Sequence, residues 1–484
     1  MITFDYADLL TAFPEIFLLL LACSVLIIDL FLPEKSRSIT SLLTKLVVIF
    51  VGISILVGAS DIVRLAFFEM YKADPISDFM KTLTCGIVLI ILVYSHRYIE
   101  NRSIFRGEFF TLNLFALLGM MIMISANHFL ILYLGLEMLS LSLYSLVALS
   151  RGVHESSEAA VKYFILGALA SGLLLYGISM IYGATGELSL SGVASSLSDR
   201  SISLNLALFG LVFIVAGIAF KLGAVPFHMW VPDVYQGAPT SITILIGTAP
   251  KIAAFAFIFR ILVEGMGDPR IASEWQQMLL MLAILSIALG NFVAIAQTNI
   301  KRMLAYSTMA HMGFVLLGLS SGSTNGIIAA MFYVITYVLA SLTAFGTILF
   351  LARKGFESDN IEDFKGLSHT NPWVAFLMLI SMLSMAGIPP IIGFWGKLSI
   401  LQVIVESGFI GVAIFTVVLS LIGAFYYLRI IKFMFFDKIE ESREIDQKAN
   451  AFFLLTVNGL SLLILGFVPG VILGFCKRVI ELSI

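Results

Sequence analysis

Long runs of apolar residues constrain this chain more than any other feature. A helix that crosses a bilayer needs about 20 mostly apolar residues, because lipid offers no hydrogen-bond partner to a free backbone group. The sequence therefore predicts an all-α integral membrane protein, a single polytopic domain over residues 1–484. Fourteen stretches meet the requirement, and they lie at 13–31, 42–63, 77–95, 109–124, 128–150, 159–182, 203–225, 242–264, 275–296, 303–321, 327–352, 373–396, 405–428 and 452–474.

The composition excludes several classes of protein. Apolar residues make up 60% of the chain and charged residues 12%, whereas a soluble domain has roughly 25% charged residues. A formal net charge of -2 provides no basic field for nucleic acid, so we expect no nucleic-acid partner. The three cysteines, Cys23, Cys85 and Cys476, are scattered without the spacing of metal ligands, and we interpret them as membrane-core residues.

The distribution of basic residues predicts the topology. Most of the lysines and arginines between the predicted spans lie in the odd-numbered connections. Short loops rich in lysine and arginine stay on the cytoplasmic side of a membrane. The odd-numbered connections should therefore be cytoplasmic, and with an even number of spans both termini should face the periplasm.

Two of the predicted spans, the seventh and the twelfth, contain helix-breaking residues. In span seven, Gly223 and Pro226 follow Lys221, and span twelve contains the sequence SMAGIPPIIGFWGK. Proline removes a helix hydrogen bond, and a broken helix is tolerated in a membrane only where it lines protein or water. Two breaks five spans apart indicate inverted repeats with a transport site between them. We predict that residues 109–264 (spans four to eight) and 275–428 (spans nine to thirteen) form the two repeats.

Four ionisable residues lie deep in the predicted spans or beside the breaks: Glu137, Lys221, Lys251 and Lys397. Each such charge raises the free energy of membrane insertion by about 2.5–3.5 kcal/mol, so its presence indicates a structural or functional role. A carboxylate about 4 Å from a lysine gains around 4 kcal/mol at an effective dielectric near 20, so a Glu137–Lys221 contact can act as a switch for a neighbouring proton carrier. The alternatives are structural salt bridges or lysines that snorkel to the interface.

A second group of candidates has a weaker signal. Lys162 lies near a span start, where snorkelling is an equal alternative, and His228 and His311 are the histidines in or beside the membrane interior. Histidine can relay protons near neutral pH, although a packing role remains open for both. Polar residues that can surround these histidines are Tyr306, Ser307, Thr308, Tyr333 and Tyr337, which can equally hold helices together. Snorkelling is the preferred interpretation of the lysines and arginines near other span ends, which are Lys45, Arg64, Lys81 and Arg260.

Four long motifs resemble a known family. The chain is similar, from its first span to its last, to the antiporter-like membrane subunits of NADH:quinone oxidoreductase (complex I) and of Mrp-type cation/proton antiporters. The sequence PDVYQGAP, Lys397 and the short segment after the last span resemble one of the sister types in this family. The motifs, in chain order, are KLGAVPFHMWVPDVYQGAPT, TAPKIAAF, QTNIKRMLAYSTMAHMGF and SMAGIPPIIGFWGK.

The resemblance implies fourteen helices, two inverted five-helix repeats and a central polar axis. It implies that Glu137 and Lys221 form the switching pair, that Lys251 is the central proton carrier and that Lys397 is the outlet. His228 and Lys162 would be possible companions of this axis.

The resemblance also implies a function, proton translocation in the bacterial inner membrane, driven by redox chemistry in other subunits. The partners would be other membrane subunits of complex I, including an M-type neighbour and the small membrane subunits. We expect no cofactor and no metal on this chain, which has neither a GxGxxG motif nor a cysteine cluster. The alternatives are a stand-alone or Mrp-type Na⁺(K⁺)/H⁺ antiporter subunit and an assembly scaffold with inert charges.

Overall fold

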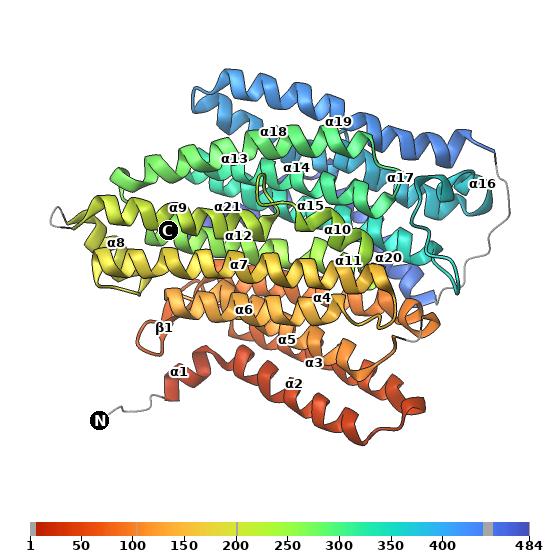
Figure 1. The fold of residues 1–484 in the computed structure, drawn as a ribbon, viewed down its shortest axis with the longest axis horizontal. Coiled ribbons are helices and arrows are strands. Elements are labelled where there is room, and N and C mark those ends of the chain that lie inside the picture. The colour runs from red at the N-terminus through yellow and green to blue at the C-terminus, as the bar shows by residue number, and fades with distance from the viewer. Residues whose placement is uncertain (1–5, 103, 200–201, 439–448, 484) are drawn as a thin grey trace.

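The computed structural model describes residues 6–102, 104–199, 202–438 and 449–483. Almost all of them are helical, and Figure 1 shows the long helices running side by side as one bundle. Over these ranges, thirteen helices are long and apolar enough to cross a membrane. The predicted all-α membrane fold is confirmed.

The helices of the first half follow the predicted spans closely. They are α1 (Tyr6–Thr11), α2 (Phe13–Phe31), η1 (Glu34–Ser36), α3 (Arg37–Gly58), α4 (Pro75–Asn101), α5 (Gly107–Ser125), α6 (Phe129–Val147), α7 (His154–Thr185), α8 (Leu190–Ser198), α9 (Leu204–Leu222), α10 (Trp230–Gly237), α11 (Thr240–Gly247), α12 (Ala249–Ile258) and η2 (Phe259–Gly265).

The second half continues the same pattern. Its helices are α13 (Pro269–Ile295), α14 (Ile300–Ser320), α15 (Thr324–Leu351), η3 (Ile361–Phe364), α16 (Leu367–Thr370), α17 (Pro372–Ala386), α18 (Ile392–Glu406), α19 (Ile410–Phe436), α20 (Ala449–Phe467) and α21 (Gly470–Ser483).

The two predicted helix breaks are present. α9 ends before Gly223, which has a φ of 78°, and α17 ends before Gly387, which has a φ of 82°. This left-handed backbone conformation favours glycine and commonly ends a helix. The chain resumes as α10 after the first break and as α18 after the second. The predicted span 373–396 is therefore two half-helices, and it ends ten residues later than expected, at Glu406.

Other boundaries differ from the predictions where polar residues lie at helix ends. α3 ends at Gly58 rather than at residue 63, and the chain then forms a hairpin of two strands that the hydropathy pattern did not predict. These strands are β1 (Arg64–Ala66) and β2 (Tyr71–Ala73). α19 continues to Phe436, eight residues beyond the predicted end, because helical backbone extends past the apolar part of the span.

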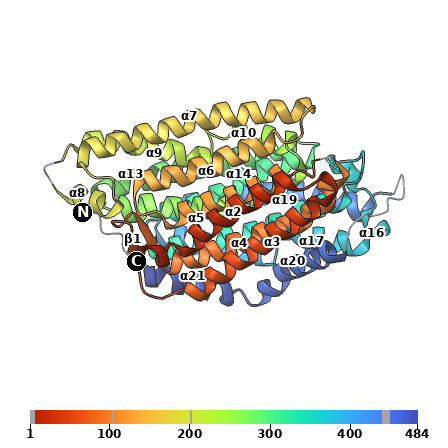
Figure 2. The same cartoon turned by 90° about the horizontal axis from the view of Figure 1, so that it is seen from below.

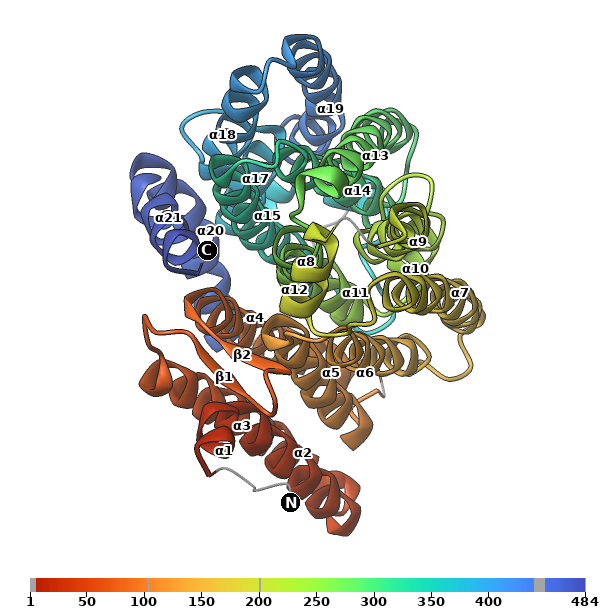
Figure 3. The ribbon, with the colours of Figure 1, turned by 90° about the vertical axis from the view of Figure 1, so that its left-hand side faces the viewer.

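The two ends of the bundle are distinct. The β1–β2 hairpin, α8 and both ends of the described chain lie at one end, which faces the viewer in Figure 3. Both ends lying on the same side agrees with an even number of crossings. The membrane side that this end faces and the two inverted repeats remain predictions. Arg443 and Lys448, two of the basic residues in the thirteenth connection, lie outside the described residues.

The centre of the bundle is formed by span eight (α11, α12 and η2) together with α14 and α15. The most hydrophobic stretch of span eight is entirely buried, whereas α2, α3, α19 and α20 lie at the periphery (Figures 2 and 3). α5 and α6 approach closely at two glycines: a Cβ on Gly119 would lie 2.6 Å from the backbone nitrogen of Leu139. Small residues permit such contacts between membrane helices.

Two residues that were expected to snorkel are instead fully buried in ion clusters. Arg260, with 0% exposure, donates two hydrogen bonds of 2.7 Å to Asp74 and one of 2.7 Å to Glu264. Burial alone would raise the pKa of Asp74, but Arg260 and the nearby Lys72 hold that pKa at about 2. Lys81 lies 2.5 Å from Glu15. The snorkelling interpretation is wrong for Arg260 and Lys81, because carboxylates distant in the sequence meet them inside the protein.

Arg260→Ala should destabilise the fold by about 3 kcal/mol, because it removes the guanidinium from the buried Asp74 and leaves Lys72 as the remaining cation beside Asp74 and Glu264 among the described residues. Thermal unfolding of the protein in detergent measures the loss. Arg270→Ala is the matched control, since Arg270 is partly exposed and pairs with Asp268 at the end of the bundle. Equal unfolding temperatures for the two variants would contradict the structural importance of the buried cluster.

Candidate functional site

The break in span seven brings a lysine and a carboxylate to the same region. Lys221 is at the end of α9, and its Nζ donates a hydrogen bond of 3.1 Å to the hydroxyl of Ser140 on α6. Glu137 lies one turn before Ser140 on the same helix, and its buried Oε1 has no hydrogen-bond partner among the residues that the structure describes. The two predicted switching residues are therefore neighbours, but over the described ranges no ion pair joins them.

Lys251 occupies the centre of the bundle. It follows the interruption of span eight at Thr248, and its side chain is almost completely buried, at 1% exposure. Its Nζ donates a hydrogen bond of 3.2 Å to the carbonyl of Leu222, the last residue of α9. The ring of Trp230 lies 5.7 Å from the same ammonium. The carbonyl end of a helix carries partial negative charge, so the broken helix itself stabilises the positive charge of Lys251.

Lys397 has an equivalent environment at the second break. Its Nζ donates a hydrogen bond of 3.0 Å to the carbonyl of Ala386, the last residue of α17, and one of 2.8 Å to the hydroxyl of Ser420. The ring of Phe314 lies 5.4 Å away. Both broken helices therefore place their carbonyl ends against a lysine from the next helical segment or the next span.

Between these lysines, His311 is the centre of a network of hydroxyl groups. Its Nδ1 lies 2.6 Å from the hydroxyl of Tyr333, and its Nε2 lies 2.9 Å from that of Tyr427. Tyr427 is in turn 2.5 Å from Ser307. Imidazole and hydroxyl groups can each accept a proton on one side and donate one on the other, so this chain has the chemistry of a proton relay.

Tyr337 connects this network to span eight. Its hydroxyl lies 2.8 Å from that of Thr308 on α14 and donates a hydrogen bond of 3.2 Å to the carbonyl of Gly247. Gly247 is the last residue of α11, one turn before Lys251. The ring of Tyr337 also lies 5.1 Å from that of His311. Polar groups of the second half of the bundle thus reach the turn that precedes Lys251.

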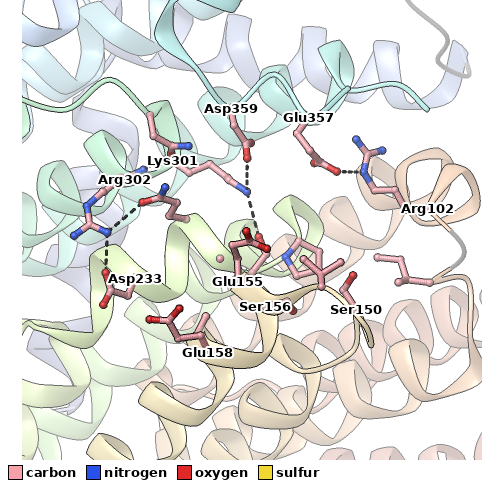
Figure 4. A pocket seen from close by; sticks show the side chains of 18 of the residues that line it. Arg102, Ser150, Glu155, Ser156, Glu158, Asp233, Lys301, Arg302, Glu357 and Asp359 are labelled. Atoms are coloured by element: carbon pink, nitrogen blue, oxygen red, sulfur yellow. Dashed lines mark hydrogen bonds and ion pairs between the residues drawn. The ribbon is translucent and has the colours of Figure 1, made fainter. Parts of the chain in front are cut away.

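A cavity of about 530 Å³ opens at the end of the bundle opposite the β-hairpin. Figure 4 shows its charged lining, which comes from α7, α10, α14 and the loop after α15. Asp233 of α10 binds Lys162 of α7 at 2.7 Å and Arg302 of α14 at 2.7 Å. Lys301 lies 3.2 Å from Asp359 on the loop.

The predicted site residues thus fall into several places. Lys251 and His311 are buried in the interior, Glu137 and Lys221 lie at the first break, and Lys397 lies half-buried at the second. Lys162 is 42% exposed and ion-paired at the cavity mouth rather than deep in the bundle. His228 lies in the connection between α9 and α10, beside the exposed Met229, and no hydrogen bond in the described part of the chain joins it to Lys221 or Lys251.

Four of the five polar residues expected around the histidines are in the network, and Tyr306 makes none of these contacts over the described ranges. Five further residues of these sites were not predicted from the sequence: Ser140, Ser420, Tyr427, Asp233 and Asp359. The serines and the tyrosine give no local signal, because hydroxyl groups are common in membrane helices. The two aspartates offered a signal, since each is an acidic residue near basic residues of a short connection.

A family comparison and a comparison with individual relatives identify the same family. Residues 126–423 match a family described as NADH:quinone oxidoreductase/Mrp antiporter, transmembrane. The chain is 52% identical over 476 residues to NADH-quinone oxidoreductase subunit N of Nitrosomonas europaea, with 98% of each chain covered.

Two solved structures share the fold. A chain of respiratory complex I from Thermus thermophilus superposes with a TM-score of 0.81 at 32% identity, over 95% of this chain and 98% of that one. A chain of the Mrp complex from Dietzia sp. has a TM-score of 0.82 at 18% identity, over 99% of this chain and 97% of that one. The second likeness concerns the fold alone.

His311→Phe should keep the shape of the ring but leave the hydroxyls of Tyr333 and Tyr427 without their shared partner. Each buried group that loses its hydrogen bond costs about 1–3 kcal/mol. Thermal unfolding in detergent should therefore occur at a lower temperature than for the native protein. His369→Phe, on the exposed surface of α16, is the control. Unchanged unfolding of the His311 variant would show that the network does not hold these helices together.

Proposed function

Because the chain belongs to the NADH:quinone oxidoreductase/Mrp antiporter family of transmembrane proteins, we propose that it is the N-type antiporter-like subunit of a respiratory NADH:quinone oxidoreductase. In this role it carries protons along its central polar groups. NADH oxidation and quinone reduction take place on other subunits, and this chain holds no cofactor. The N type is supported by the identity to relatives of that name over nearly the whole chain.

The observation that carries the proposal is the pair of lysines held by the carbonyl ends of broken helices. Neither Lys251 nor Lys397 has a carboxylate within ion-pair distance in the described part of the chain. A proton can therefore leave either ammonium without breaking an ion pair. The groups between them are hydroxyls and an imidazole, all of which can donate and accept protons.

Glu137 and Lys221 complete the proposed mechanism. In the structure, Lys221 binds Ser140, and Glu137 has a buried oxygen with no hydrogen-bond partner in the described part of the chain. If Lys221 moves from Ser140 to Glu137, a positive charge moves away from Lys251, and a proton is then better held on Lys251. The reverse movement repels that proton toward Tyr337 and His311. Redox chemistry elsewhere in the complex drives this alternation through the neighbouring membrane subunits.

The same proposal places the chain in its membrane. The end with the β-hairpin and both described termini faces the periplasm of a bacterial inner membrane, and the end with the charged cavity faces the cytoplasm. The partners are the M-type neighbour and the small membrane subunits of the complex. An Mrp-type antiporter is the less favoured function, because the likeness to the Mrp chain is at 18% identity.

Lys251→Ala in the assembled complex tests the function. Proton uptake into vesicles, driven by NADH oxidation, should fall by about tenfold or more, which is the lower range for removal of a positioned acid–base group. Lys432→Ala is the matched control, because Lys432 lies 64% exposed near the end of α19. Pumping by the Lys251 variant at the level of this control would contradict the proposal.

A further inference from the structure

The charged cavity shown in Figure 4 contains a carboxylate that the proposed mechanism does not use. We propose that Asp359, held by Lys301 on the cavity wall, is the group through which protons leave the aqueous phase and enter this chain. This inference rests on the proposed function, which requires protons to reach Lys251 from one end of the bundle. It adds an entry residue on the loop between α15 and α17, a segment outside the membrane spans.

Asp359 is held firmly in the cavity. Its backbone carbonyl accepts a hydrogen bond of 2.7 Å from the nitrogen of Ile300, and the adjacent Asn360 pairs with Asn299 in a β-bridge. The side chain is 26% exposed, and Oδ2 lies 3.2 Å from Nζ of Lys301. Oδ1 is buried and has no hydrogen-bond partner among the described residues. One oxygen thus binds the lysine, and the other has unoccupied lone pairs on the inner side of a carboxylate that is partly exposed to the cavity.

The neighbouring charges leave Asp359 able to take up a proton. Lys301 faces it from α14, Arg102 from the end of α4 and Glu357 from its own loop. Burial raises the pKa of Asp359 above its ordinary value, and Glu357 raises it further, although Lys301 and Arg102 oppose this. An aspartate with a raised pKa exchanges protons nearer to neutral pH than one on the open surface.

Two other carboxylates of the cavity, those of Asp233 and Glu357, each bind two neighbouring groups. Asp233 binds two cations, Lys162 and Arg302. Glu357 contacts the guanidinium of Arg102 and accepts a hydrogen bond of 2.9 Å from the hydroxyl of Tyr98. Cations and hydrogen-bond donors stabilise the ionised form of a carboxylate, so each additional one disfavours protonation. Asp359 has one cation and one oxygen without a hydrogen-bond partner among the described residues, which distinguishes it from both.

A route leads inward from this pair. Lys301 and Thr308 lie on α14 seven residues apart, which is two turns on the same face and about 10 Å. Thr308 contacts Tyr337, which binds the carbonyl of Gly247 beside the interruption of span eight. The hydroxyl of Tyr235, on the cavity helix α10, is buried near Gly247. Hydroxyl groups therefore lie between the cavity and the turn that carries Lys251.

The proposed proton transfer begins and ends with Asp359 as a carboxylate. A hydronium ion in the cavity gives its proton to the carboxylate of Asp359 and leaves a water molecule. The neutral carboxyl no longer attracts the ammonium of Lys301, which remains hydrogen-bonded to the carbonyl of Ala238 at 3.2 Å. The carboxyl then releases the proton to a water molecule on the inner side, and the carboxylate that is restored binds Lys301 again.

The test is Asp359→Asn in the whole complex, reconstituted into vesicles, with Glu362→Gln as the matched control. Glu362 lies three residues along the same loop, 73% exposed and paired with Lys365. We expect NADH-driven proton uptake to fall about tenfold in the Asp359 variant, as for loss of a positioned proton acceptor, and to be unchanged in the control. Formate, a small weak acid that enters the cavity, should restore uptake in the Asp359 variant.

Restoration by formate distinguishes proton delivery from a structural role, because a distorted loop would not be corrected by a weak acid. Proton uptake equal to that of the control would overturn the inference. So would a loss that formate does not relieve. If Lys251→Ala abolishes pumping while Asp359→Asn does not, the proposed function stands and only the entry residue is wrong.

Discussion

A positive charge inside a bilayer requires a negative partner, and in this protein broken helices supply it. The carbonyl ends of α9 and α17 point at Lys251 and Lys397. A carbonyl end carries only partial charge, so it stabilises an ammonium without the full attraction of a carboxylate. The glycines at the breaks, Gly223 and Gly387, thus end two helices where their last carbonyls can stabilise a lysine at this depth.

The protein treats its other buried cations differently. Arg260 is bound by Asp74 and Glu264 at the hairpin end of the bundle, and Lys81 is bound by Glu15. These charges are fully compensated, and they join the ends of helices that lie far apart in the sequence. Full compensation suits a structural role, because each ion is costly to separate from its partners. The structure thus has two kinds of buried cation: those bound by carboxylates and those bound by the carbonyl ends of helices.

The sequence predicted the elements whose cause is local. α2 begins and ends at the predicted residues 13 and 31, and both helix breaks occur where glycine and proline are concentrated. The lysines beside the breaks were recognisable from their apolar surroundings. Partners distant in the sequence were not recognisable: Arg260 meets Asp74 across 186 residues, and His311 meets Tyr427 across 116. Local hydropathy also cannot distinguish a snorkelling arginine from a buried one, since both lie at span ends.

Asp233 couples the two halves of the bundle electrostatically. Its carboxylate is shared by Lys162 from α7, in the first half, and Arg302 from α14, in the second. A carboxylate shared in this way makes the two cations competitors, so a change in the position of one alters the electrostatic energy of the other. The energetic effects of changes in the two halves should therefore be non-additive, and a thermodynamic cycle across Lys162 and Arg302 would contain a cross term.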